Sequence, residues 1–238
     1  MKRSSGQTAA PLPSGKRHCS TSPVKAGSDV LPNRVHRRII LSDCGIPIYR
    51  AGSRQVLLAA LADCIEGHES LRQKAGLLYR DISLNNLMIN KDNRGFLINL
   101  DLAINEQRVS ASGAKAKTGT WAFMAIGALQ GEQHSFIHDL ESFFWKGRVI
   151  SRFDKWNFVD TDERAEELAG LKLSVMSKEE MFMKMTTKYF TQYYQPLAPL
   201  VNSLRKVVFP EDKPWKREDE RLYSRMGEML RKEREDMK

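Results

Sequence analysis

Cysteine is scarce in this chain, with only Cys19, Cys44 and Cys64 among 238 residues and no metal-binding spacing between them. We expect these thiols to be reduced, as in an intracellular protein of the cytoplasm or nucleus. No apolar run reaches about 18 residues, so no membrane-spanning helix is expected. The first residues, Met1–Gly6, lack the apolar core of a signal peptide. Composition therefore argues against a secreted protein and against a membrane protein.

Negative charge is almost absent from the first 38 residues, where eight Lys and Arg accompany a single acid, Asp29. The whole chain carries a net charge of +9, so most of the excess positive charge lies in this segment. Ser, Pro, Gly and Lys are prominent there, which is typical of disorder. We predict a disordered basic tail over 1–33 that suits an acidic partner or an import receptor. Nothing in the tail predicts binding to a specific nucleic acid.

The rest of the chain, 34–234, has the pattern of one α+β domain that is mostly α-helical. Val35–Leu41 is typical of a strand, and Ser53 to Gly76 predicts a helix with Ser53 as its N-cap. Residues 108–117 are polar and small, which favours a mobile loop. A helix that begins near Asp139 is expected to be interrupted near 146–148. Further helices are predicted over 161–170, 177–190, 196–208 and 217–234.

A short β-hairpin is predicted in the middle of the chain. Leu87–Asn90 and Phe96–Leu100 have the apolar content of two strands, and the polar turn Lys91–Gly95 joins them. Gly95 supplies the permissive backbone that a hairpin turn needs. Asn86 enters the first strand and Asp101 leaves the second. We expect these two residues to lie opposite each other at the open end, roughly 5 Å apart.

Polar side chains at this open end suggest phosphate chemistry. Asp81 precedes Asn86 by five residues, and Asp101 follows Asp81 by twenty. An amide oxygen and a carboxylate held together, with a second aspartate just upstream, suit a divalent metal that carries phosphates. The spacing therefore predicts a phosphoryl-transfer site.

These residues resemble the catalytic loop and metal-binding motif of protein kinases. The similarity is closer to the fungal-type protein kinase family, and it extends from about Arg34 to Met226. Four motifs occur in the family's order: Arg80–Ser83, Leu97–Ala103, Thr118–Ala125 and His138–Phe143. The resemblance implies a protein-kinase-like C-terminal lobe that contains the small catalytic hairpin.

The resemblance also implies roles for single residues. Asp81 would accept the proton of the substrate hydroxyl, with ATP and Mg²⁺ as cofactors. Asn86 and Asp101 would bind the magnesium ion and, through it, the nucleotide. Thr120 would contact the catalytic aspartate, as in serine/threonine kinases. Arg80 would pair with a phosphate on Ser110, Ser112 or Thr118. Tyr79 and Asp139 would support the shape of the catalytic loop.

Several features depart from the kinase pattern. No G-x-G-x-x-G motif occurs, and the residues before Arg34 are too few for a kinase small lobe, so we expect the N-terminal lobe to be largely absent. Ser83 replaces a lysine of serine/threonine kinases, and Ala103 replaces the glycine of D-F-G. Gly127 replaces the glutamate of A-P-E, so the ion pair that usually anchors this segment is not available.

Three functions remain open at this point. The first is a protein serine/threonine kinase that transfers the γ-phosphate of Mg-ATP to a protein substrate. The second is a catalytically impaired pseudokinase or kinase fragment that acts as a binding module. The third is a small-molecule kinase, which the Thr120 motif disfavours relative to a protein kinase.

Overall fold

The computed structural model describes residues 45–108, 120–146, 162–215 and 218–237. The chain divides into two units, Met1–Ile40 and Leu41–Lys238, and all described residues belong to the second. Several predictions lie outside the described residues and stay predictions. They concern the tail over 1–33, the strand Val35–Leu41, the part of the predicted loop 108–117 that follows Arg108, the phosphate acceptors Ser110, Ser112 and Thr118, and the helix interruption beyond Lys146.

The predicted helix after Ser53 is confirmed as α1 (Arg54–Ala75). The Ser53 side chain accepts a hydrogen bond from Val56 N at 3.1 Å, which satisfies one of the free N–H groups of the first turn. Gly76 ends the helix with a left-handed backbone (φ 63°) that residues other than glycine adopt rarely. The short 3₁₀ helix η1 (Ile48–Arg50) precedes α1.

Two small antiparallel sheets accompany the helices. The first has the order β1-β3-β4 and consists of β1 (Ile46–Pro47), β3 (Leu87–Ile89) and β4 (Gly95–Leu97). The second pairs β2 (Leu77–Leu78) with β5 (Ile104–Asn105). The β3–β4 pair is the predicted hairpin, with Leu87 opposite Leu97.

Gly95 has a different role from the one predicted. Its φ is not positive, and Asn93 supplies the left-handed position of the turn instead (φ 59°). Gly95 lies against α1, where a Cβ atom would be 2.7 Å from Ala60 Cα and closer still to the Ala60 carbonyl oxygen. Asp63 of α1 accepts hydrogen bonds from Gly95 N (3.0 Å) and Arg94 Nε (2.9 Å). Close packing on α1 therefore requires the glycine.

Replacing Gly95 by alanine is expected to lower the free energy of unfolding by about 1–3 kcal/mol, because backbone must move to admit the methyl group. Gly52→Ala is the matched control, since a Cβ at Gly52 meets no atom within 4 Å. Urea unfolding of both variants measures the difference. Equal stability of the two variants would contradict the packing role of Gly95.

The remaining helices confirm a mostly helical α+β fold. The predicted C-terminal helices are present; the helix predicted over 161–170 extends to Met176, and the ends of the others differ from the predictions by a few residues. The elements are the 3₁₀ helices η2 (Glu106–Arg108), η3 (Trp121–Phe123), η5 (Gln195–Leu197) and η6 (Pro210–Asp212) and the α-helices α2 (Ile126–Leu129), α3 (Phe136–Lys146), α5 (Asp162–Met176), α6 (Glu179–Tyr189), α7 (Ala198–Val208) and α8 (Arg221–Asp236).

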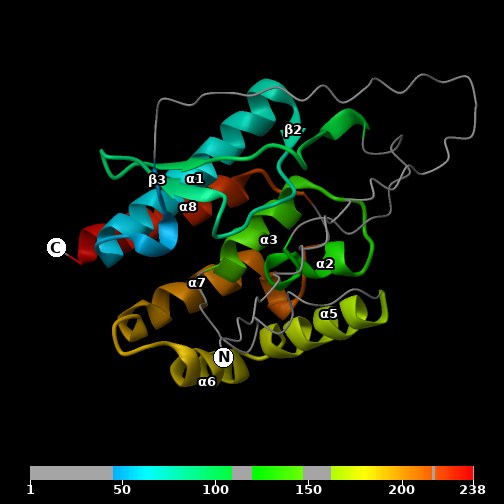
Figure 1. Cartoon of the computed structure of the whole chain (residues 1–238). Coiled ribbons are helices and arrows are strands. Elements are labelled where there is room, and N and C mark those ends of the chain that lie inside the picture. The colour runs from blue at the N-terminus through cyan, green and yellow to red at the C-terminus, as the bar shows by residue number, and fades with distance from the viewer. Residues whose placement is uncertain (1–44, 109–119, 147–161, 216–217, 238) are drawn as a thin grey trace, which may run out of the picture. The chain divides into compact units, whose positions relative to one another are not determined.

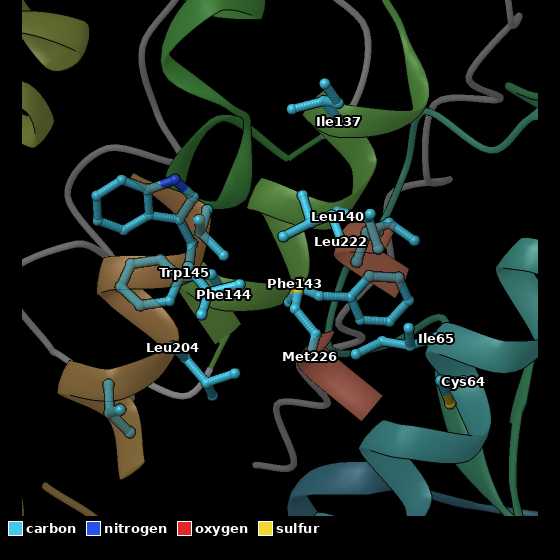
Figure 2. Close-up of a cluster of buried hydrophobic side chains, with 14 of the residues drawn as sticks. Cys64, Ile65, Ile137, Leu140, Phe143, Phe144, Trp145, Leu204, Leu222 and Met226 are labelled. Carbon is cyan, nitrogen blue, oxygen red and sulfur yellow. The ribbon is translucent and has the colours of Figure 1, made fainter. Parts of the chain in front are cut away.

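The helix α3 lies at the centre of the core (Figure 1). Every residue from Phe136 to Trp145 is buried, as expected for a helix that is apolar on most of its surface. Phe143 points toward α1 and α8, whereas Phe144 and Trp145 lie toward α7 (Figure 2). The helix α8 packs along α1 on one side, and α5, α6 and α7 pack in sequence on the other. Among the described helices, none combines the length and apolarity needed to cross a membrane.

Candidate functional site

The loop between β2 and β3 is held by a single buried carboxylate. Asp139 of α3 accepts hydrogen bonds from the backbone N–H groups of Tyr79 (2.9 Å) and Arg80 (3.0 Å). Arg80 has a left-handed backbone (φ 68°), which a residue with a Cβ adopts only at a cost in free energy. The two hydrogen bonds to Asp139 stabilise that conformation, so α3 determines the shape of the loop that carries Asp81.

Two histidines complete the surroundings of Asp139. His68 Nε2 of α1 and His134 Nε2 each lie 2.9 Å from a carboxylate oxygen. Burial alone would raise the pKa of Asp139, but the hydrogen bonds and charge of His134 and His68 hold that pKa well below its usual range. Asp139 is therefore an anion at neutral pH, and an anion is the stronger acceptor for the backbone N–H groups.

A second chain of contacts links the same loop to the hairpin and to α8. The Tyr79 hydroxyl donates to the Ile98 carbonyl oxygen at the end of β4. His68 Nδ1 lies 2.8 Å from the Tyr223 hydroxyl of α8. Burial and the nearby carboxylates of Asp81 and Asp139 raise the pKa of Tyr79. These contacts fix the loop relative to both the strand end and the C-terminal helix.

Asp81 and Asn86 lie together, as the sequence predicts. Asn86 Nδ2 donates to Asp81 Oδ2 (2.8 Å) and to the Asp81 carbonyl oxygen (2.9 Å). Asp81 Oδ1 is buried and has no hydrogen-bond partner, and the same holds for Arg80 Nε. Buried polar atoms without a partner are rare and destabilising in folded proteins. These two atoms therefore retain unused hydrogen-bonding capacity, an acceptor on Asp81 and a donor on Arg80.

The expected pairing of Asn86 with Asp101 is wrong. Because Leu87 opposes Leu97, the register sets Asn86 opposite Ile98, and Ile98 N donates to Asn86 O at 3.1 Å. Asp101 follows three residues later and is exposed. The prediction failed because it placed Gly95 in the turn, whereas Gly95 is the first residue of β4 and pairs with Ile89, which sets the register.

A backbone change at Asn99 explains why the ribbon ends there. Asn99 takes a left-handed conformation (φ 67°), and its side-chain oxygen accepts a hydrogen bond from Asp101 N at 3.3 Å. Asn99 directly follows Ile98, which is the residue opposite Asn86. Sequence reasoning missed it, although asparagine before a turn is a known signal for left-handed backbone.

Thr120 is the first residue that the structure describes after Arg108. It precedes η3, its carbonyl oxygen accepts from Phe123 N, and its side chain makes no capping hydrogen bond to η3. The helix η3 packs against α3, the helix that carries Asp139. Thr120 and Asp81 therefore both belong to segments that α3 supports.

The side-chain oxygen atoms at the open end of the hairpin are of the type that a hard divalent cation binds. The amide oxygen of Asn86 is a ligand that Mg²⁺ accepts, and the carboxylate of Asp101 lies on the turn that follows β4. Across the described ranges, His, Cys, Asp and Glu side chains form no group of three that could hold a metal. A cation at this position would therefore depend on Asn86 and on water in addition to carboxylates.

The family relationship can be stated from a comparison of sequences. The model of the family "Fungal protein kinase" matches residues 2–146. This range begins in the predicted tail and includes Asp81, Asn86, Asp101 and Asp139. A search of curated proteins found no match. Because the family model covers more than half of the 238 residues, the chain belongs to the fungal protein kinase family.

Proposed function

We propose that the chain is a protein serine/threonine kinase that transfers the γ-phosphate of Mg-ATP to a hydroxyl group of a protein substrate. The observation that carries this proposal is the buried, partnerless Oδ1 of Asp81 beside Asn86. A carboxylate oxygen in that state suits a substrate hydroxyl as its hydrogen-bond donor. The loop is a kinase-like catalytic loop in this proposal, and its support by Asp139 of α3 agrees with that interpretation.

In this mechanism, Asp81 positions the substrate hydroxyl and takes its proton. The hydroxyl oxygen forms the new bond to the γ-phosphorus, the bond from phosphorus to the bridging oxygen breaks, and ADP leaves. Asn86 orients Asp81 through its hydrogen bond to Oδ2, which leaves Oδ1 for the substrate. Arg80, whose Nε has no partner, adds positive charge to this loop. Thr120 resembles the threonine that contacts the catalytic aspartate in serine/threonine kinases, which supports a hydroxyl group as the acceptor.

Magnesium would be held by Asn86 together with Asp101. When bound, it would neutralise charge on the transferred phosphate and its neighbour. The position of Asp101 weighs on this assignment, because the strand register does not set it opposite Asn86. That observation favours a second candidate function, a catalytically impaired kinase that acts as a binding module.

A transfer assay separates the two candidates. Purified full-length chain is incubated with γ-labelled ATP, Mg²⁺ and a mixture of Ser- and Thr-containing peptides, and its thermal unfolding is measured with and without Mg-ATP. Ligand at 100 times its Kd stabilises the folded state by ~2.7 kcal/mol, which raises Tm by roughly 5–10 °C for a chain of this size. We expect both phosphate transfer and this Mg-dependent shift.

Each negative result has a separate meaning. A shift in Tm without transfer supports the binding module and excludes the enzyme. The absence of both excludes nucleotide chemistry for this chain. Transfer to a small alcohol in preference to every peptide would replace the protein substrate by a small molecule.

A further inference from the structure

The segment Trp121–Gly127 lacks the anchor that kinases place in it. Gly127 stands at the position of the missing glutamate, and a side chain there would have to displace the side chains of Glu132 and His138. A Cβ atom there would lie 2.5 Å from His138 Nε2 and closer still to Glu132 Oε2. Any contact that holds this segment in place must therefore come from other elements.

Glu141 of α3 provides the first such contact. Its side chain is buried (4% exposed), and Oε1 accepts hydrogen bonds from Ile126 N and Trp145 Nε1, both at 2.8 Å. Ile126 is the first residue of α2, and its N-cap residue Ala125 makes no side-chain capping bond. Glu141 therefore satisfies an N–H group that the short helix leaves free.

Lys172 of α5 provides the second contact. It is 1% exposed, and Nζ donates to the Met124 carbonyl oxygen (2.5 Å) and lies 3.5 Å from the Trp121 carbonyl oxygen. Nζ is also 4.6 Å from the centre of the Trp145 ring, a cation–π distance. The segment is thus bound through its N–H by α3 and through its carbonyl groups by α5.

Burial disfavours the charged forms of the Glu141 and Lys172 side chains. It raises the pKa of Glu141 to about 7, against the opposing effects of the Ile126 N–H, the Trp145 N–H and Lys172, while nearby Glu132 adds to the rise. It lowers the pKa of Lys172 to about 7, against the attraction of Glu141. Burying charged groups costs free energy unless polar partners compensate for it, and the partners here include the Ile126 N–H and the Met124 carbonyl oxygen of the segment, which indicates a specific role for both side chains.

We propose that Glu141 and Lys172 are positioning residues for the segment Trp121–Gly127. They hold this segment and the adjoining Thr120, and so do the work of the anchor that is missing at Gly127. Neither residue touches the reacting groups, and both act through the backbone of the segment. The catalytic consequence rests on the proposed kinase function, whereas the positioning itself does not. Lys172 lies outside the residues matched by the family model, so the pair joins the C-terminal helices to the matched region.

Hydrogen exchange measures the positioning without any activity. Glu141→Met and Lys172→Met keep side-chain length and remove both the charge and the hydrogen-bonding groups that contact the segment. The control, Leu204→Ala, creates a cavity in the core on α7 without touching the segment's hydrogen bonds. We expect amide exchange in the peptide over 121–129 to be about 10- to 100-fold faster in the two charge variants, and unchanged in the control once exchange rates are corrected for global stability. Equal exchange in all three variants would overturn the proposal.

Peptide kinetics then tests the catalytic consequence. In an active chain, both charge variants should raise the KM for the peptide about tenfold and leave the KM for ATP unchanged. A general loss of folded protein would lower kcat instead and would not separate the two KM values, and this result would overturn a role in substrate positioning. If the wild-type chain transfers no phosphate, the proposed function fails, while hydrogen exchange still decides whether the pair positions the segment.

Discussion

Replacing Asp81 by asparagine is expected to reduce phosphate transfer by ~100- to 10,000-fold, the range typical for loss of a general base. The amide has nearly the same shape as the carboxylate, so it can still accept the hydrogen bond from Asn86 Nδ2. It cannot take the proton of the substrate hydroxyl. The substitution also removes a buried charge with one partnerless oxygen, so the Tm should not fall.

The matched control for this variant is Asp92→Asn. Asp92 lies in the exposed turn at the closed end of the same hairpin, and we expect its substitution to change neither rate nor Tm. Initial rates with labelled ATP at saturating peptide provide the measurement. A rate for Asp81→Asn within threefold of wild type would remove Asp81 from the mechanism and, with it, the central observation behind the proposed function.

Replacing Asp139 by alanine is expected to lower the free energy of unfolding by about 3–5 kcal/mol, the usual effect of removing one partner from a buried charged pair. Four donors lose their acceptor: the N–H groups of Tyr79 and Arg80 and the rings of His68 and His134. For a chain of this size, the loss corresponds to a fall in Tm of roughly 10 °C.

Local exchange should accompany this loss of stability. The left-handed Arg80 depends on Asp139, so amide exchange at 79–81 should accelerate more than exchange in α7, which makes none of these contacts. Differential scanning calorimetry and hydrogen exchange give the two readouts, with Asp92→Ala as the control. An unchanged Tm, or acceleration spread evenly over the chain, would mean that Asp139 does not determine the shape of the loop.

The helices could be predicted well from sequence because their signals are local. Ser53 and Gly76 mark the ends of α1 by capping chemistry that needs no distant contact. The hairpin was also predictable, since two apolar runs flank a polar turn. Its register was not, because Gly95 pairs with Ile89 and thereby sets Ile98, rather than Asp101, opposite Asn86, and Asn99 then takes a left-handed backbone. A register depends on such single residues, which periodicity does not reveal.

The amino-acid sequence alone determined the family motifs, the fold class and the proximity of Asp81 to Asn86, because the four residues between them restrict how far the two side chains can separate. Only the tertiary structure decided which groups support the loop that carries that pair and which support the segment Trp121–Gly127. His68, His134, Glu141 and Lys172 come from separate elements, and each meets its partner through packing around α3. A buried charge is stable only where the fold brings its partners to it, and those partners are set by three-dimensional contacts rather than by spacing along the chain.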